Sequence, residues 1–337
     1  MIKVGIVGAT GYTARYLIGY ILRHPTMELV AATSRNPENQ TVADSHPSYY
    51  GQIDLAFQSF DIEPLVRRGV QCVFSCLPHA ASAYAVKKIL AAGIRVVDFS
   101  ADYRLNDVAT FETWYNVEHP DPDRVGSVPY GMPELFRDDI RNADLVANPG
   151  CFPTSAIIPI APLIKAKLVE TKEFIIDSKT GISGAGRTPK PHLHFPECNE
   201  SVAAYAIGKH RHGPEIQQIL LRKTNVSSQI IFTPHLIPMD RGILSTIYLD
   251  PTVGTKVIDI KGTLAEAYHD EPFVRLVEQP PATKNVSGSN FCDIFVGECG
   301  NKIIISSVID NLIKGASGAA IQNFNLMYDF PETTALL

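Results

Sequence analysis

The chain has 337 residues, which is enough for two domains of ordinary size. Hydrophobic residues make up 45% and charged residues 19%, which excludes a disordered chain. The net charge is −5 and the basic residues form no runs, which argues against a nucleic-acid partner. Residues 1–8 lack the layout of a signal peptide, and no stretch approaches ~18 consecutive apolar residues. We therefore expect a soluble cytoplasmic protein with no membrane partner.

Short β-branched runs alternate with helical stretches in the first half of the chain. Strands are predicted at residues 3–7, 28–33, 72–76, 95–99 and 145–147. The i, i+3, i+4 spacing of apolar residues predicts helices at 13–24 and 80–92. Strands that alternate with helices indicate crossover units and a parallel sheet. The segment 100–142 is long for a plain connection, so we expect a functional loop there.

The pattern changes after residue 150. A helix is predicted at 154–167, and longer strands follow at 174–178, 230–233 and 243–249. A helix at 257–268 precedes two further strands, at 291–296 and 302–308. This order predicts a mixed α+β domain with a largely antiparallel sheet. The last predicted helix, 315–327, is expected to dock back on the first domain.

A nucleotide-binding pattern lies between the first strand and the first helix. Residues 8–14 (GATGYTA) form a G-x-x-G-x-x-A version of the dinucleotide fingerprint. Gly8 allows the tight turn, Gly11 lets the backbone approach a pyrophosphate, and Ala14 lets the helix pack on the strand. The alternative is a plain tight turn. The α/β pattern thus predicts a Rossmann-type domain over 1–150, completed by a C-terminal helix at about 312–337, and a second domain over 151–311.

The end of the second strand discriminates between nucleotides. NAD sites usually carry an acidic residue there, about 20 residues past the fingerprint, on the ribose 2′-hydroxyl. This chain has Ser34 and Arg35 at that point and no acid before Glu38. An arginine pairs bidentately with a 2′-phosphate, so we predict NADP as the cofactor. The alternative is that Arg35 is a solvated surface arginine.

One of the six cysteines lies where chemistry is expected. Residues 148–154 (NPGCFPT) end a strand and open a helix at the predicted domain boundary. The dipole of a helix N-terminus favours a thiolate, which is the nucleophilic form of cysteine. Cys151 is therefore a candidate nucleophile, with a buried cysteine at a turn as the alternative. The other five cysteines lack zinc-binding spacings, and most are expected to be small, reduced, buried residues.

Seven motifs follow one another along the chain: 8–13 (GATGYT), 34–35 (SR), 98–104 (DFSADYR), 148–151 (NPGC), 178–187 (SKTGISGAGR), 208–216 (GKHRHGPEI) and 310–315 (DNLIKG). With these motifs the chain resembles the N-acetyl-gamma-glutamyl-phosphate reductases, which belong with the aspartate-semialdehyde dehydrogenases. The resemblance covers essentially the whole length. It implies NADPH-dependent reduction of N-acetyl-L-glutamyl 5-phosphate to N-acetyl-L-glutamate 5-semialdehyde and phosphate, in arginine biosynthesis.

The resemblance also implies a mechanism. The Cys151 thiolate attacks the acyl phosphate and expels phosphate, and hydride then reduces the resulting thioester. The family match gives His212 the acid/base role and His210 a supporting one, although one of these histidines is expected only to pack or to form hydrogen bonds. Glu215 lies three residues after His212, on the same face if a helix begins at Pro214. It is expected to orient an imidazole or to bind substrate.

Two further features are assigned to anion binding. The small residues of 181–187 (GISGAGR) expose backbone N–H groups like an anion nest, to hold phosphate or to line the nicotinamide pocket. A flexible strand connection is the alternative. Arg104 suits a carboxylate or a phosphate, with an exposed ion pair as the alternative. The resemblance then implies cofactor contacts at Gly8, Thr10, Gly11, Tyr12, Thr13, Ser34, Arg35, Ser183, Gly184 and Asn311, and substrate contacts at Arg104, Ser178, Arg187 and Glu215.

Three alternatives stay open at this point. His192, His194, His210 and His212 form two H-x-H pairs, but acyl-phosphate reduction needs no metal and we expect none. The substrate of a related reductase, aspartyl phosphate or a carrier-protein-linked aminoacyl phosphate, is the second reading. The third alternative is a non-catalytic NADP-sensing protein. The presence of both a candidate nucleophile and a candidate base argues against it, because a sensor needs neither. A homo-oligomer, dimer or tetramer, is expected from the resemblance.

Overall fold

The computed structural model describes residues 1–38 and 40–337. The chain divides into two compact units. Unit 1 comprises Met1–Pro149 together with Ala316–Leu337, and unit 2 comprises Gly150–Gly315. The chain therefore leaves unit 1 after Pro149 and returns to it for its last 22 residues.

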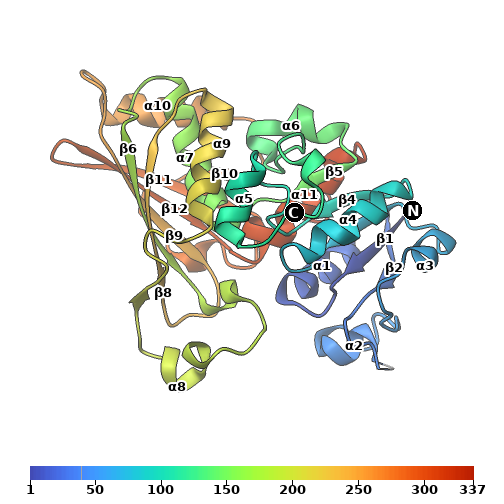
Figure 1. Cartoon of the computed structure of the whole chain (residues 1–337). Helices are drawn as coiled ribbons and strands as arrows, with labels where there is room; N and C mark the ends of the chain where they lie inside the picture. The colour runs from blue at the N-terminus through green and yellow to red at the C-terminus, as the bar shows by residue number, and fades with distance from the viewer. Residues whose placement is uncertain (39) are drawn as a thin grey trace. The chain divides into compact units, whose positions relative to one another are not determined.

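Unit 1 is built on a parallel sheet, and this confirms the predicted α/β class. Its five strands have the order β2-β1-β3-β4-β5 in the described residues (Figure 1). The strands are β1 (Ile2–Val7), β2 (Met27–Ala32), β3 (Cys72–Ser75), β4 (Arg95–Asp98) and β5 (Leu145–Ala147). The helices are α1 (Tyr12–Arg23), α2 (Val42–Ser45), α3 (Ile62–Arg67), α4 (Ala81–Ala91), α5 (Val108–Tyr115), α6 (Pro133–Arg141) and α11 (Gly318–Met327). The short strands are buried, as expected for a parallel sheet covered by helices.

Two of these helices correct the sequence prediction, because α5 and α6 lie inside the segment 100–142, where we expect a functional loop from the sequence. Asp107 caps α5 by accepting a hydrogen bond from the Thr110 N–H at 2.7 Å. Pro133 is the first residue of α6, where its missing N–H costs no helical hydrogen bond. Both helices are short, eight and nine residues, so each offers few turns from which a helical period can be read.

Unit 2 is built on a seven-stranded sheet with the order β10-β11-β12-β9-β6-β8-β7 in the described residues. Four of its strand pairings are antiparallel, while β6 with β8 and β10 with β11 are parallel. The strands are β6 (Glu173–Thr180), β7 (Ala203–Ala204), β8 (Gln229–Leu236), β9 (Ile243–Leu249), β10 (Val274–Leu276), β11 (Cys292–Cys299) and β12 (Lys302–Ile309). The helices are α7 (Cys151–Lys165), α8 (Phe195–Cys198), α9 (His212–Thr224) and α10 (Val257–Ala267).

One face of the unit 2 sheet carries its core. Helices α7, α9 and α10 pack against that face, and α7 contacts both of the other helices (Figure 1). Helix α7 is almost wholly buried although it contains Pro159 and Pro162. Pro162 has no N–H to donate to the carbonyl of Ile158, and the Tyr268 hydroxyl donates a hydrogen bond to that carbonyl instead. This contact lets a proline-containing helix stay continuous inside the core.

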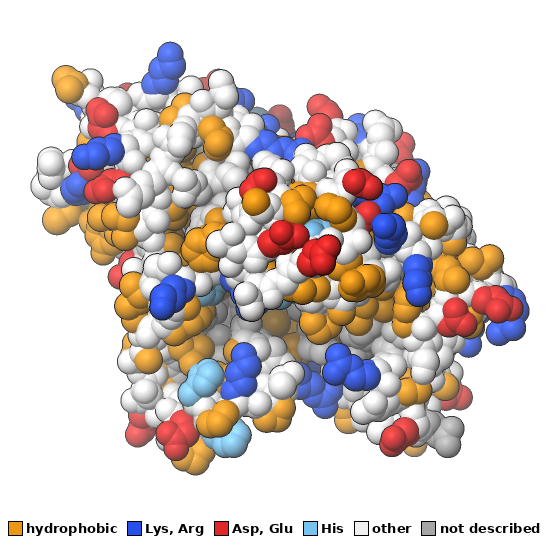
Figure 2. All heavy atoms as spheres, in the orientation of Figure 1, with side chains coloured by type: hydrophobic (Ala, Val, Ile, Leu, Met, Phe, Trp, Pro, Cys, Tyr) orange, Lys and Arg blue, Asp and Glu red, His pale blue; other side chains and the backbone are white. Residues whose placement is uncertain are grey.

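The surface shows mixed charge. Acidic and basic side chains are interspersed over the face drawn in Figure 2, in keeping with the small net charge of −5. No helix among residues 1–38 and 40–337 is long and apolar enough to cross a lipid bilayer.

Candidate active site

The turn between β1 and α1 contains two glycines with different requirements. Gly8 has a φ of +83°, and a Cβ at this position would lie 2.9 Å from the carbonyl oxygen of Cys76. Gly11 precedes α1 without a side-chain cap, and a Cβ there would meet no atom within 4 Å. The N-terminus of α1 is therefore uncapped by a side chain and has open space beside Gly11, as the pyrophosphate of a dinucleotide requires.

The end of β2 is tied to the same turn. Thr33 accepts hydrogen bonds from the Gly8 N–H at 3.1 Å and from the Ala9 N–H at 2.8 Å. Ser34 and Arg35 follow directly, the first half-buried and the second exposed. The fold thus brings the predicted 2′-phosphate side chains next to the fingerprint turn, which also carries Thr10, Tyr12 and Thr13. The residues present fit NADP.

Arg104 lies in a network at the ends of β4 and β5. Its guanidinium donates from Nε to the Asn148 carbonyl and from Nη2 to the Phe99 carbonyl, each at 2.7 Å. Arg104 is therefore a residue that holds two strand ends together, a role that its sequence position did not indicate. The same network buries Asp98, and burial together with the nearby Asp102 carboxylate raises the pKa of Asp98 to about 6.

The predicted nucleophile, Cys151, is the first residue of α7. The helix begins here rather than at residue 154, because Gly150 takes the extended conformation of an N-cap and leaves the helix with no side-chain cap. The thiol is half-buried. Of the other cysteines, only Cys299 is exposed, and burial raises the pKa values of Cys72 and Cys76 to about 12. The helix position and partial access together distinguish Cys151 from the other thiols.

Glu215 holds the residue before the cysteine. Its side chain is 1% exposed, and its Oε1 accepts a hydrogen bond of 2.9 Å from the Gly150 N–H. Its second oxygen, Oε2, lies 4.0 Å from Nε2 of His212. A buried carboxylate bonded to the backbone is poorly placed to contact a substrate directly. These contacts favour the orienting role predicted for Glu215 over the substrate contact.

The two predicted histidines lie together at the start of α9. Their ring centroids are 4.9 Å apart, and each ring meets the edge or face of Phe152, next to Cys151 in the chain. The Nδ1 of His210 accepts a hydrogen bond of 3.1 Å from the His212 N–H, so this nitrogen carries no proton. Burial, aided by Arg211, lowers the pKa of His210 to about 4. His210 is therefore a neutral imidazole near pH 7.

A tyrosine that the sequence did not single out lies beside these groups. Tyr205 is half-buried between exposed neighbours, and its ring centroid is 5.5 Å from that of His210. Burial and the negative charge of the Cys151 thiolate both raise the pKa of Tyr205, so its hydroxyl stays protonated. No spacing signal could have found this residue, because the short pairing of β7 with β8 brings it to the site.

Ser178 belongs to a buried chain of hydroxyl groups. Its hydroxyl is fully buried and bonds to Ser245 Oγ at 2.7 Å, and Ser245 bonds in turn to Ser155 Oγ at 2.7 Å. This chain of hydroxyls joins β6 and β9 to α7 inside the core. The Ser178 hydroxyl is thus engaged inside the core, and its contact with substrate stays a prediction.

The glycine-rich loop after β6 is held rigidly at its base. Gly181 and Ser183 donate backbone hydrogen bonds of 3.0 Å to Gly242 and Asp240, and Asn311 donates to Ser183 Oγ at 3.1 Å. Asn311 also accepts a bond of 2.7 Å from the Gly242 N–H. These residues fix the loop, whereas Gly184 and Arg187 at its far side are exposed. The exposed side is the part of the loop that a ligand can reach.

In the described part of the chain, no group of three or more His, Cys, Asp or Glu side chains is arranged to hold a metal ion.

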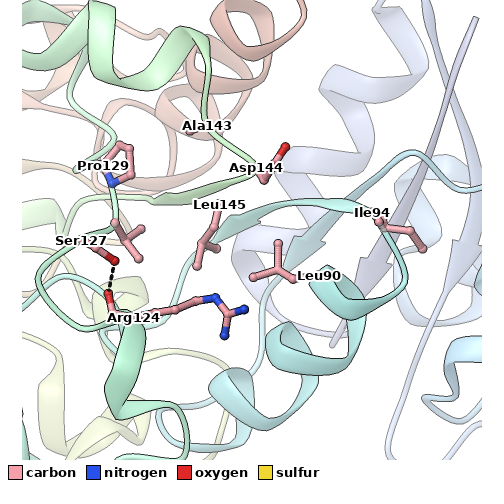
Figure 3. Close-up of a pocket in the computed structure, with 10 residues that line it drawn as sticks. Leu90, Ile94, Arg124, Ser127, Pro129, Ala143, Asp144 and Leu145 are labelled. Atoms are coloured by element: carbon pink, nitrogen blue, oxygen red, sulfur yellow. Dashed lines mark hydrogen bonds between the residues drawn. The ribbon is translucent and has the colours of Figure 1, made fainter.

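One hollow lies apart from the cluster of predicted site residues. A hollow of about 370 Å³ lies in unit 1, between the end of α4 and strand β5 (Figure 3). Its lining includes Leu90, Arg124 and Leu145, and none of the predicted site residues.

Comparison with known proteins agrees with this arrangement. Residues 3–143 match the family described as "Semialdehyde dehydrogenase, NAD binding domain", and residues 151–311 match "Semialdehyde dehydrogenase, dimerisation domain". Among solved structures, an aspartate semialdehyde dehydrogenase II from Vibrio cholerae has a TM-score of 0.73 at 16% identity, covering 98% of this chain and 99% of its own. The aspartate semialdehyde dehydrogenase with NADP from Candida albicans has a TM-score of 0.72 at 18% identity, covering 97% and 98%. These similarities define a semialdehyde dehydrogenase-type fold.

Curated relatives are closer in sequence. The N-acetyl-gamma-glutamyl-phosphate reductase of Rhodopirellula baltica is 49% identical over all of this chain and 98% of its own length. That of Desulforudis audaxviator is 43% identical over the same shares. The chain belongs to the N-acetyl-gamma-glutamyl-phosphate reductase family, as its motifs predicted.

Proposed function

We propose that this protein reduces N-acetyl-L-glutamyl 5-phosphate to the 5-semialdehyde and phosphate, with NADPH and through a thioester on Cys151, in arginine biosynthesis. The observation that carries the proposal is the cluster at the start of α7. There a half-buried thiol opens a helix, two histidine rings contact Phe152 on one side of it in the chain, and a buried glutamate binds Gly150 on the other. This cluster, in a chain of this family, has the nucleophile and the proton-transfer groups that the reaction needs.

The roles of the chain's own groups follow from their contacts. The dipole of α7 favours the Cys151 thiolate, which attacks the acyl carbon and displaces phosphate. NADPH, which the fingerprint turn with Ser34 and Arg35 would hold, would supply the hydride that reduces this thioester. Collapse of the resulting hemithioacetal on Cys151 gives the aldehyde and releases the thiolate. The Gly150 N–H bond to Glu215 keeps the turn before Cys151 in place during these steps. A fixed nucleophile lowers the entropic cost of attack.

The contacts support His212 as the acid/base. The low pKa of His210, about 4, leaves it unable to hold a second proton near pH 7. His212 instead lies with Nε2 4.0 Å from Oε2 of the buried Glu215, which is placed to orient its imidazole. His210 supports it by accepting the hydrogen bond from the His212 N–H. The exposed side of the loop at Gly184 and Arg187 is our proposed phosphate site, with Arg104 kept as a candidate for the substrate carboxylate.

The choice of NADP leads to a test at Arg35. Arg35→Ala is expected to weaken NADPH binding by ~1.5–3 kcal/mol, because the arginine loses a charge-assisted bond to the 2′-phosphate. NADH, which lacks that phosphate, should bind almost unchanged. Fluorescence titration of both nucleotides measures the difference. Arg67→Ala, at another exposed arginine of unit 1, is the matched control. Equal losses for the two nucleotides would place Arg35 outside the phosphate pocket.

The substrate is tested by running the reaction in reverse. NADP reduction is expected with N-acetylglutamate semialdehyde and phosphate, and only at background rate with aspartate semialdehyde and phosphate. The absorbance of NADPH reports both rates. A preference for aspartate semialdehyde would favour the related-reductase reading. If the protein completes not even a single turnover with any semialdehyde, the result would favour a nucleotide sensor.

We also propose that unit 2 forms a homo-oligomer through the free face of its sheet. Ile231, Ile175, Tyr248 and Ile304 are register partners on four adjacent strands, so they form one apolar row across β8, β6, β9 and β12. The first three are 36–37% exposed on the face away from α7. A row of large apolar side chains on an uncovered sheet is typical of an interface between subunits. The matched family description, a dimerisation domain, supports this surface.

Light scattering tests the interface. Ile175→Lys places a charge in the middle of the row and is expected to shift the molar mass toward the monomer at micromolar concentration. Ile258→Lys on α10, 67% exposed and away from the sheet, is the control and should leave the mass unchanged. A wild-type monomer, or equal behaviour of the two variants, would contradict the proposed interface.

We place this activity in the cytoplasm, where reducing conditions keep a catalytic thiol free. Fractionation of cells with an antibody to the chain tests this assignment, and recovery outside the cytoplasmic fraction would contradict it.

A further inference from the structure

A glycine packs directly against the carbon skeleton of Cys151. A Cβ added to Gly315 would lie 2.7 Å from Cβ of Cys151 and 3.1 Å from its Cα. Real Cβ atoms essentially never approach within 3.0 Å, so no side chain fits at residue 315 unless the cysteine moves.

Glycine is required at residue 315 because there is no space for a side chain, and not because of the backbone conformation. Gly315 is absent from the residues with positive φ, so an L-residue could adopt its backbone angles. It is buried in the π-helical turn Ile313–Ser317, and turns of this kind often mark functional sites. The requirement for glycine therefore comes from its neighbour, the proposed nucleophile.

Both segments that meet in this contact, the π-helical turn and the start of α7, are held in place by their own hydrogen bonds. The turn is anchored by Asp310, whose carbonyl accepts the Gly315 N–H at 3.0 Å. The Asp310 carboxylate accepts bonds from Leu312 and Gly288 and lies 3.1 Å from Arg241 Nη1. On the other side, the Glu215 bond to Gly150 and the burial of α7 hold the start of the helix.

We propose that Gly315 is a positioning residue for catalysis: its missing side chain lets the π-helical turn press against Cys151 and so fixes the direction of the thiol. This inference rests on the proposed role of Cys151 as the nucleophile. It assigns the DNLIKG segment a task in unit 2 that is separate from nucleotide contact. Because a misplacement of about 1 Å costs a reaction ~10²-fold, the contact has a large effect on turnover without touching substrate.

The test compares Gly315→Ala with two control glycines. The variant is expected to lose ~10²-fold in kcat and a similar factor in the rate of Cys151 alkylation by iodoacetamide, with NADPH binding retained. Gly262→Ala on α10, where a Cβ meets no atom within 4 Å, should change neither rate. Gly131→Ala in unit 1, where a Cβ lies 2.8 Å from Val146, should lower stability while Cys151 keeps its alkylation rate. The exposed Cys299 is an internal reference for the reagent in every variant.

A second comparison covers the case in which Gly315→Ala folds poorly. Adding Cys151→Gly removes the Cβ atom that the new methyl group meets at 2.7 Å, so Gly315→Ala should cost less stability in the Cys151→Gly background than in the wild type. Thermal unfolding measures this coupling. Unchanged Cys151 alkylation in Gly315→Ala, or an equal loss of stability in the two backgrounds, would overturn the inference alone. A wild-type protein in which Cys151 reacts no faster than Cys299 would overturn the proposed nucleophile, and this inference with it.

Discussion

Cys151→Ser is expected to abolish turnover while NADPH binding stays intact. A serine hydroxyl is nearly isosteric with the thiol but far less nucleophilic at neutral pH, because it is not ionised there. Steady-state kinetics and nucleotide titration on the same preparation check the two halves of this prediction. Activity close to that of the wild type would contradict a covalent mechanism.

The matched control for this variant is Cys299→Ser. Cys299 is the exposed cysteine at the end of β11, so its replacement tests any general effect of losing a reactive thiol. It should leave turnover unchanged. Alkylation adds a sharper comparison, since exposure alone would favour Cys299 whereas an activated thiolate favours the half-buried Cys151.

His212→Asn is expected to lower kcat by ~10²–10⁴-fold with little change in KM, as for the loss of a general acid/base. It should also remove the limb of the pH–rate profile that titrates near neutrality. His210→Asn should act mainly on KM, because the asparagine Oδ1 can accept the same hydrogen bond from the His212 N–H that Nδ1 of His210 accepts. The lowered pKa of His210, about 4, argues against it as the source of a limb near pH 7.

The pair of variants is its own control, since both remove one imidazole from the same cluster. Loss of the neutral limb in His210→Asn, with the limb kept in His212→Asn, would reverse the assignment. Pre-steady-state measurement of the hydride step separates a chemical defect from slow product release in either variant.

The local parts of the fold were predictable from sequence patterns. The fingerprint turn, the parallel strands of unit 1 and the helix that opens near Cys151 each depend on short-range signals. The alternation of buried and exposed residues along β6 also indicated which side chains face the core, and the motif alone did not show this. Phe174 and Ile176 point into the core, so Ser178, two residues further, had to share that buried face.

The rest of the site depends on contacts between distant segments, which no spacing reveals. The Glu215 bond to Gly150 spans 65 residues, and the Arg104 bond to Asn148 spans 44. Tyr205 reaches His210 only because β7 pairs with β8. The parallel pairing of β6 with β8 was likewise invisible, because α8, β7 and α9 lie between the two strands. Sequence patterns therefore indicated which residue types do chemistry, and tertiary packing determined how they are held.

The covalent intermediate is the central claim, and mass spectrometry tests it most directly. The wild-type protein is mixed with N-acetylglutamyl phosphate in the absence of NADPH, quenched in acid and digested. We predict that the peptide containing Cys151 gains the mass of one N-acetylglutamyl group, that hydroxylamine removes it, and that Cys151→Ser shows none. An unmodified Cys151 peptide under conditions that support full turnover once NADPH is added would contradict the account.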